Sequence, residues 1–243
     1  KECEVFKMKS VAIVLAAGSG SRMNNDIPKQ YMELRGKPLI YYSLQTFEDS
    51  SVDEIILVVG KDEIDYNRKH IVEKYKFSKV KEVVAGGSKR YFSVYNGLKT
   101  IKEADYILVH DGARPFVSHD LVEAILKDVR QYKACVLGVP SKDTVKIVND
   151  SNLVTNTPDR KYAWIVQTPQ AFSYFLIKKA YEAVIMELSS LGENDTKPNI
   201  TDDAMVVEHY TNHPIKLIEG SYANIKITTP EDIIVGDALI KSH

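Results

Sequence analysis

The sequence predicts an α/β protein built on a mostly parallel sheet that helices cover on both faces. Short, near-continuous apolar runs alternate with amphipathic segments of helical length, as expected for strands that are buried on both faces. The 243 residues are 44% hydrophobic and 27% charged, which is the balance of an ordinary globular protein with a sizeable core. No internal repeat and no linker divides the chain. We therefore expect a single domain over residues 11–243.

The predicted elements follow one another in a regular order. Strands are expected at 11–16, 54–60, 80–85, 106–111 and 134–140. Helices are expected between them at 38–49, 62–76, 88–101 and 119–132. Later in the chain we expect a helix near 174–189, a polar loop at 189–199, a helix from about 201, a strand near 214–218 and a helix from Pro230.

Residues 141–163 interrupt this alternation. The segments "DTVKIV" and "LVTNT" flank "NDSN", which predicts a hairpin with an Asn/Asp turn. A two-stranded ribbon is marginally stable alone in water, so another surface has to cover it. Either the parent domain or a second subunit can supply that surface. We expect a protruding β-hairpin arm.

Composition excludes several classes of protein. The net charge of −1 gives no general attraction to nucleic acid or to an anionic membrane. No run approaches the ~18 apolar residues of a membrane span. Residues 1–10, "KECEVFKMKS", are a leader of unclear origin without the apolar stretch of a signal peptide. Cys3 and Cys135 belong to no metal-binding pattern, and a reduced compartment, cytoplasmic or plastid-like, fits this usage.

The first candidate site motif is "VAIVLAAGSGSRMNNDIPKQY", residues 11–31. A small-residue turn after a buried strand exposes backbone N–H groups to a ligand. The motif is not a dinucleotide GxGxxG, because Met23 stands where the third glycine would be, and it lacks the Gly-Lys-Ser/Thr of a Walker loop. A tight strand-to-helix turn is the alternative. Two cations, Arg22 and Lys29, follow the loop.

Two further motifs follow predicted strands. In "AGGSKRYFSVYNGL" (85–98), glycines end a strand and Ser88 is a candidate cap of the next helix. In "VHDGARPF" (109–116), Asp111 and Arg114 lie at the carboxyl end of a strand, where open α/β sheets hold ligands. Asp111 is a candidate ligand of Mg²⁺, directly or through water, and Arg114 is suited to phosphate. A structural Asp–Arg salt bridge is the alternative. We expect His110 to support the site residues from behind or to pack in the core.

The remaining candidates are individually ordinary. Thr144 and Arg160 lie on the predicted arm, Thr168 lies in "QTPQAF", and Thr201 resembles a helix N-cap in "ITDDA". Near the C-terminus, "NIKITTPED" places Lys226 at a predicted strand end before a helix that starts at proline.

Taken together and in order, these motifs resemble the 2-C-methyl-D-erythritol 4-phosphate cytidylyltransferase family over nearly the whole chain, from Val11 to about Leu239. The resemblance implies transfer of a cytidylyl group from CTP to methylerythritol phosphate with release of pyrophosphate, in the non-mevalonate isoprenoid pathway. It also implies Mg²⁺ and a homodimer formed through the arm. Attack on the α-phosphorus builds negative charge on oxygen, which fixed Arg and Lys side chains stabilise.

The resemblance assigns roles residue by residue. The transition state would be stabilised by Arg22, Lys29 and Lys226. CTP would be held by Ala16, Ala17, Gly18, Gly87, Ser88, Arg90 and Ser93. The acceptor substrate would be bound by Asp111, Arg114, Thr168 and Thr201, and by Thr144 and Arg160 from the partner's arm.

Two alternatives remain open. The related ribitol 5-phosphate cytidylyltransferases share the first loop and "QTPQ", but more often carry a serine–valine pair where Gly112 and Ala113 stand here. A non-catalytic nucleotide-binding regulator is expected to lack one of Arg22, Lys29 and Lys226, and this chain has all three.

Overall fold

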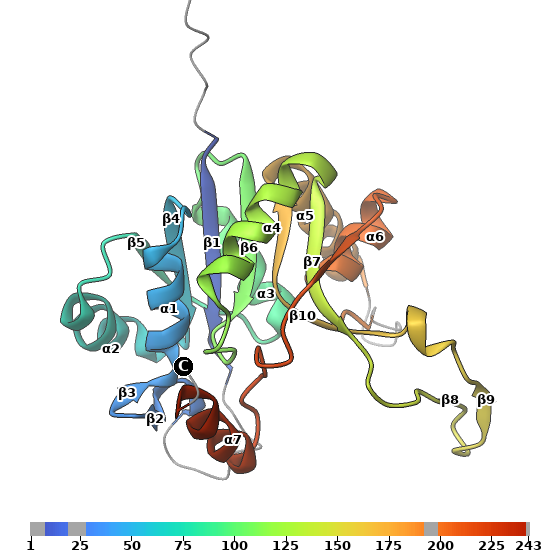
Figure 1. Ribbon diagram of the computed structural model, residues 1–243. Coiled ribbons are helices and arrows are strands. Elements are labelled where there is room, and N and C mark those ends of the chain that lie inside the picture. Colours follow the sequence, from blue (N-terminus) through green and yellow to red (C-terminus); the bar gives the residue numbers. More distant parts are fainter. Residues whose placement is uncertain (1–7, 19–27, 192–198, 242–243) are drawn as a thin grey trace, which may run out of the picture.

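The computed structural model describes residues 8–18, 28–191 and 199–241. A seven-stranded sheet forms the centre of the molecule, with strand order β11-β7-β10-β6-β1-β4-β5 (Figure 1). The strands are β1 (Ser10–Ala16), β4 (Glu54–Val59), β5 (Val80–Ala85), β6 (Tyr106–Asp111), β7 (Ala134–Pro140), β10 (Trp164–Ser173) and β11 (Lys216–Glu219). The predicted α/β fold with a mostly parallel sheet is confirmed.

Strand β10 is the exception to the parallel arrangement, and the sequence does not predict it. It runs antiparallel between β6 and β7, while β1 pairs in parallel with β4 and β6. Its centre, Gln167 to Gln170, is polar, so the alternation typical of a strand is missing although these residues are buried. Their polar side chains form hydrogen bonds with other segments of the fold.

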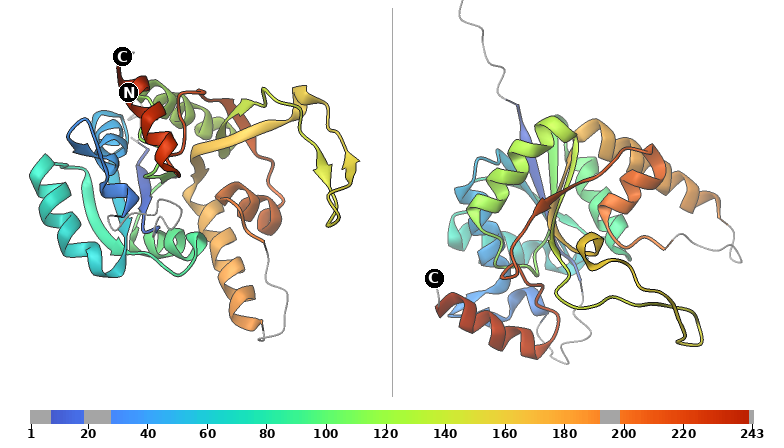
Figure 2. Two further views of the ribbon diagram at one scale, coloured as in Figure 1. Left: turned by 90° about the horizontal axis from the view of Figure 1, so that it is seen from below. Right: turned by 45° about the vertical axis from the view of Figure 1, so that its right-hand side comes forward.

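Helices cover both faces of the sheet (Figure 2). One core layer holds buried residues of α1 (Leu39–Asp49) and α4 (His119–Tyr132), with Ala12 and Val14 from β1. The opposite layer holds residues of α3 (Arg90–Thr100), α5 (Tyr174–Ser190) and α6 (Asp203–Thr211), with Val11 and Ile13 from β1. Alternate β1 residues thus enter opposite cores, which explains the unbroken apolar run.

A third, smaller cluster joins the segment around Leu34 and Leu39 to the C-terminal part of the chain. The short strands β2 (Glu33–Leu34) and β3 (Lys37–Pro38) lie beside α7 (Pro230–Lys241) (Figure 1). Leu34, Leu39 and Ile227 are its buried residues. This cluster brings Lys226 close to the loop that follows β1. Lys226 lies outside any strand, so the predicted strand end at this residue is wrong.

Two predicted helix starts are also wrong. Helix α3 begins after Lys89, and Ser88 does not cap it. The N-cap of α6 is Asp202, whose side chain accepts a hydrogen bond from the Met205 N–H, whereas the Thr201 hydroxyl donates to the Met205 sulfur. The predicted helix at 62–76 exists as α2 (Ile64–Asn67) followed by a π-helical segment, Arg68–Glu73.

The predicted hairpin arm is present and extends away from the sheet (Figures 1 and 2). Its strands, β8 (Ile147–Val148) and β9 (Val154–Asn156), pair only with each other. Several apolar side chains of the arm and its base are exposed: Ile147, Val148, Leu153, Val154, Tyr162, Ile165 and Val166. No helix in the described ranges is long and apolar enough to cross a membrane.

Candidate active site

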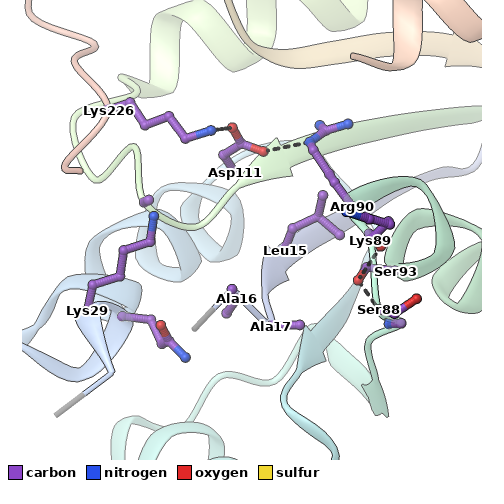
Figure 3. Close-up of a pocket in the computed structure, with 14 residues that line it drawn as sticks. Leu15, Ala16, Ala17, Lys29, Ser88, Lys89, Arg90, Ser93, Asp111 and Lys226 are labelled. Carbon is purple, nitrogen blue, oxygen red and sulfur yellow. Dashed lines mark hydrogen bonds and ion pairs between the residues drawn. The ribbon is translucent and has the colours of Figure 1, made fainter. Parts of the chain in front are cut away.

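The main pocket lies at the carboxyl edge of the sheet. Because β1, β5 and β6 are parallel neighbours or near neighbours, their following loops meet at this edge. The pocket has a volume of about 440 Å³. It is lined by Leu15, Ala16, Ala17, Gly18, Lys29, Gln30, Gly87, Ser88, Lys89, Arg90, Ser93, Asp111, Ala113 and Lys226 (Figure 3).

The two small-residue loops pack directly on each other. A Cβ atom added to Gly86 would lie 2.4 Å from the Ala17 Cβ, and one added to Gly87 would lie 2.3 Å from the Phe92 Cβ. The Ser93 hydroxyl accepts a hydrogen bond from the Gly87 N–H at 3.0 Å. Glycine is therefore required at both positions by close approach, and Ser93 fixes the loop that forms one wall of the pocket.

Asp111 is the ionic centre of the site. Its Oδ2 is 2.6 Å from the Lys226 Nζ, and its Oδ1 accepts from the Arg90 Nε at 3.2 Å (Figure 3). Burial by itself would raise the pKa of Asp111, but Arg90, Lys226 and Arg114 together hold it well below its usual range. Asp111 therefore remains a carboxylate at neutral pH.

Arg90 lines the pocket but directs its terminal nitrogens away from it. Nη1 and Nη2 donate to the two oxygens of Asp203 at 2.8 and 2.7 Å. Burial acts to lower the pKa of Arg90, but the carboxylates of Asp203 and Asp111 outweigh it and raise the pKa well above its ordinary value. Its guanidinium is a permanent cation held between two carboxylates.

A hydrogen-bonded cluster fixes the segment that carries Lys29. This residue opens a 3₁₀ turn, Lys29–Tyr31. The Tyr31 hydroxyl donates to the Glu63 Oε2 at 2.9 Å and accepts from the Asn67 Nδ2. Gln30 also donates to Glu63, at 3.3 Å. Lys29 thus enters the pocket from an anchored turn, on the side opposite Ser88 (Figure 3).

A second pocket of about 300 Å³ adjoins the first. Arg90, Asp111 and Lys226 line both pockets, so the ionic centre stands between them. The second pocket is further lined by Arg114, Val166, Gln167, Thr168, Gln170, Thr201 and Asp202. Four of the predicted acceptor-site residues, Asp111, Arg114, Thr168 and Thr201, therefore gather around one cavity.

His110 supports Asp111 indirectly, through hydrogen bonds to neighbouring residues. The Thr168 hydroxyl accepts from the Asp111 N–H at 3.0 Å and lies 3.1 Å from the His110 Nδ1. The His110 Nε2 lies 3.2 Å from the Arg114 carbonyl oxygen. These partners assign the proton to Nε2 and leave Nδ1 to accept from Thr168. Burial lowers the pKa of His110 to about 4, so the ring is neutral at pH 7.

Two predicted site residues within the described ranges are not brought into these pockets. Thr144 and Arg160 lie on the arm and line neither the first pocket nor the second. The Arg160 Nη1 instead donates to the Lys142 carbonyl oxygen at 3.3 Å. Arg22 lies outside the described residues.

The sequence analysis missed several polar residues at the site, among them Gln30 and Asp203. Gln30 lines the first pocket and is 3% exposed. Asp203 is fully buried against Arg90. The signal that could have revealed Asp203 is its position directly before the apolar run "AMVV", in the first turn of a helix.

No group of three or more His, Cys, Asp or Glu side chains in the described ranges is arranged to hold a metal ion. A lone carboxylate still fits Mg²⁺, because this ion is commonly bound by one or two carboxylates together with substrate phosphates and waters. Asp111, ionised and shared by both pockets, meets that requirement.

The fold and these two adjoining cation-lined pockets define an α/β enzyme of the nucleotidyltransferase class. Residues 10–242 match the family model described as "2-C-methyl-D-erythritol 4-phosphate cytidylyltransferase". The chain belongs to that family.

Individual relatives agree with this assignment. The 2-C-methyl-D-erythritol 4-phosphate cytidylyltransferase of Lachnoclostridium phytofermentans is 49% identical over 235 residues, covering 97% of both chains. That of Lachnospira eligens is 48% identical, covering 96% of this chain and 99% of its own. The crystal structure of 4-diphosphocytidyl-2C-methyl-D-erythritol synthase from Anaerococcus prevotii DSM 20548 matches with a TM-score of 0.82 and 37% identity, covering 96% of each chain.

Proposed function

We propose that this chain transfers the cytidylyl group of CTP to 2-C-methyl-D-erythritol 4-phosphate, releasing pyrophosphate, as its family does in the non-mevalonate route to isoprenoids. The observation that carries the proposal is the pair of adjoining pockets with Asp111, Arg90 and Lys226 between them. Transfer of a cytidylyl group between two anionic substrates requires a pocket for each substrate and positively charged side chains where the two pockets meet.

The nucleotide is assigned to the larger pocket. Ala16, Ala17 and Gly18 present a small-residue surface to it, and the loop with Gly87 and Ser88 forms the facing wall. Backbone groups and a Ser hydroxyl can pair with the exocyclic amino and carbonyl groups of cytosine. Ser93 shapes that wall through Gly87, so its contribution to base binding is to hold the loop. Arg90 borders the pocket and anchors Asp111.

The phosphates are assigned to Lys29, Lys226 and Arg22. A phosphate oxygen of the acceptor attacks the α-phosphorus of CTP, the bond to the bridging oxygen breaks, and pyrophosphate leaves with the electron pair. The acceptor phosphate is already nucleophilic at neutral pH, so no strong general base is needed. Fixed ammonium and guanidinium groups stabilise the charge that grows on the phosphoryl and pyrophosphate oxygens.

The acceptor is assigned to the smaller pocket, with Arg114, Thr168 and Thr201 on its walls. Two backbone carbonyls, those of Asn224 and Val166, accept from the Arg114 guanidinium at 2.8 and 3.4 Å and so set its orientation. Asp111 lies where the two substrates would meet. Mg²⁺ would be held there by Asp111 together with nucleotide phosphates, and it would neutralise part of the phosphate charge.

We further propose that the chain works as a homodimer through the 141–163 arm. The exposed apolar side chains of the arm have no cover within the described part of the chain. Burying them against a second copy would remove them from water, and would carry Thr144 and Arg160 to the partner's acceptor pocket. This arrangement accounts for two polar residues that line neither of the two pockets described above.

A pyrophosphate-release assay tests the proposed function directly. Purified protein is incubated with MgCl₂, CTP and either methylerythritol 4-phosphate or ribitol 5-phosphate. Released pyrophosphate is measured, and the diphosphocytidyl alditol product is identified by mass spectrometry. We expect turnover with methylerythritol phosphate, and its loss with EDTA. Turnover of ribitol 5-phosphate alone would overturn the assigned acceptor. A Lys29→Ala variant that binds CTP and turns over as fast as wild type would overturn the assigned phosphate site.

A further inference from the structure

Asp203 is a fully buried acidic residue outside the groups assigned to substrate. It opens helix α6, and its carboxylate accepts from both terminal nitrogens of Arg90 and from the Tyr181 hydroxyl. Its backbone N–H donates to the Gln170 Oε1 at 3.1 Å. Asp203 is therefore fixed by α3, α5 and β10 at once.

A buried ion pair of this kind is a weak source of net stability. Removing two charges from water costs several kcal/mol per ion, and apolar replacements of similar size are often neutral or stabilising. Breaking such a pair, by contrast, leaves an uncompensated charge. The Asp203–Arg90 pair is thus better explained by the geometry that it fixes than by the energy that it supplies.

That geometry reaches the centre of the site. The guanidinium is planar and rigid, so holding Nη1 and Nη2 on Asp203 also fixes the direction of Nε. The Arg90 Nε donates to the Asp111 Oδ1, while the Asp111 Oδ2 meets Lys226 (Figure 3). A continuous chain of alternating charges therefore runs from Asp203 through Arg90 and Asp111 to Lys226.

Arg90 also borders the first pocket, which we assign to an anionic nucleotide. Without Asp203, its two terminal nitrogens would lose the carboxylate that they share. With both of them on Asp203, the Nε edge of the guanidinium is left to orient Asp111.

We propose that Asp203 is a positioning residue for the transfer reaction, acting through Arg90 to hold the Asp111 carboxylate at the junction of the two pockets. The proposal rests on the proposed function, and it adds a residue that touches neither substrate. It predicts that losing the Asp203 charge slows the chemical step more than it weakens nucleotide binding.

The first test compares Asp203→Asn with Tyr181→Phe. The second variant removes the other hydrogen bond to the same buried carboxylate and leaves the Arg90 pair intact. For Asp203→Asn we expect kcat to fall about 10-fold or more with the KM for CTP changed by less than about 3-fold, because orientation rather than uniform binding is lost. For Tyr181→Phe we expect kcat within about 3-fold of wild type. Equal losses of kcat in the two variants would overturn the proposal.

A double-mutant cycle tests whether Asp203 acts through Arg90. We expect the losses in kcat of Asp203→Asn and Arg90→Gln to be strongly non-additive, with the double variant no worse than Arg90→Gln alone. Fully additive losses would overturn the proposal. Where a single variant fails to fold, the Arg90→Gln/Asp203→Asn double variant, which lacks both charges, tests the proposal instead. Full activity of that double variant would overturn the proposal.

A measurement without substrate separates this proposal from the proposed function. In nitrogen-15 NMR spectra, a fixed Arg90 Nε–H gives a slowly exchanging signal, assigned by its loss in Arg90→Gln. We expect that signal in wild type and Tyr181→Phe and its loss in Asp203→Asn. A persistent signal in Asp203→Asn overturns the positioning role, whatever the enzyme assay gives. An inactive wild type with the expected signals overturns the proposed function alone.

Discussion

The body and the arm of this molecule hold their polar groups in opposite ways. In the body, Asp111 is 8% exposed and is paired on both oxygens, with a neutral His110 and Thr168 behind it. On the arm, Thr144 and Arg160 are exposed among uncovered apolar side chains. The body therefore holds its polar groups in fixed ion pairs and hydrogen bonds, whereas these two residues of the arm remain exposed within the described part of the chain.

The largest effect is expected from the cations of the body. Lys226→Met removes a charge from the border of both pockets, and we expect kcat to fall roughly 10²–10³-fold, the usual cost of removing a group that stabilises transition-state charge. Steady-state pyrophosphate release measures it. The exposed Lys99→Met on α3 is the matched control and is expected to keep wild-type kcat. A Lys226→Met enzyme within a factor of ten of wild type would contradict the assigned role.

The buried neutral His110 makes the stability of the body pH-dependent. Its folded pKa of about 4 lies below the ordinary value of 6.5, so the unfolded chain binds more protons between those values and stability falls as pH drops through this window. We expect roughly 3 kcal/mol to be lost between pH 7 and pH 4 from this residue.

Urea unfolding of the metal-free protein at several pH values measures this loss. His110→Gln, which has no titrating ring, serves as the control, and its stability is expected to depend less on pH over the same window. Parallel curves for the two proteins would contradict the neutral assignment.

The arm prediction concerns which subunit each residue serves. Arg160→Ala is expected to lower kcat/KM for the acceptor about 10–100-fold, the range for a lost hydrogen bond to a charged group. Mixing Arg160→Ala with Lys226→Met then distinguishes the two geometries. If the arm serves the partner, exchange forms mixed dimers with one intact site, and about one quarter of wild-type activity returns. No recovery after exchange would place Arg160 in its own chain's site.

The smallest effect is expected from the apolar surface of the arm. Val154→Ser removes an exposed apolar side chain, and we expect the dimer dissociation constant to rise about 5–30-fold, corresponding to ~1–2 kcal/mol of lost burial. Sedimentation equilibrium measures it. Met186→Ser, also at an exposed apolar residue but on α5 of the body, is the control and should leave the dissociation constant unchanged. A strictly monomeric, fully active wild type would remove the basis for this prediction.

Apolar periodicity predicted most of the fold because buried parallel strands leave a continuous signal. It failed at β10, where Gln167 and Gln170 are buried but polar, since their partners come from distant segments such as Ser221 and Asp202. The same limit applies to the site. Motifs located Lys29, Asp111 and Lys226. Asp203, however, lies 113 residues from its partner Arg90 in the sequence, and only the folded structure shows that the two side chains meet.

The arm leaves the sheet at Pro140 and returns at Trp164, and these two residues pair with each other on adjacent strands β7 and β10. Both ends of the insertion are therefore anchored side by side, so its length can change without shifting the register of either strand. Lengthening such a loop costs only a slowly growing closure entropy. The arm can thus vary in length while the edge of the sheet that carries the two pockets keeps its shape.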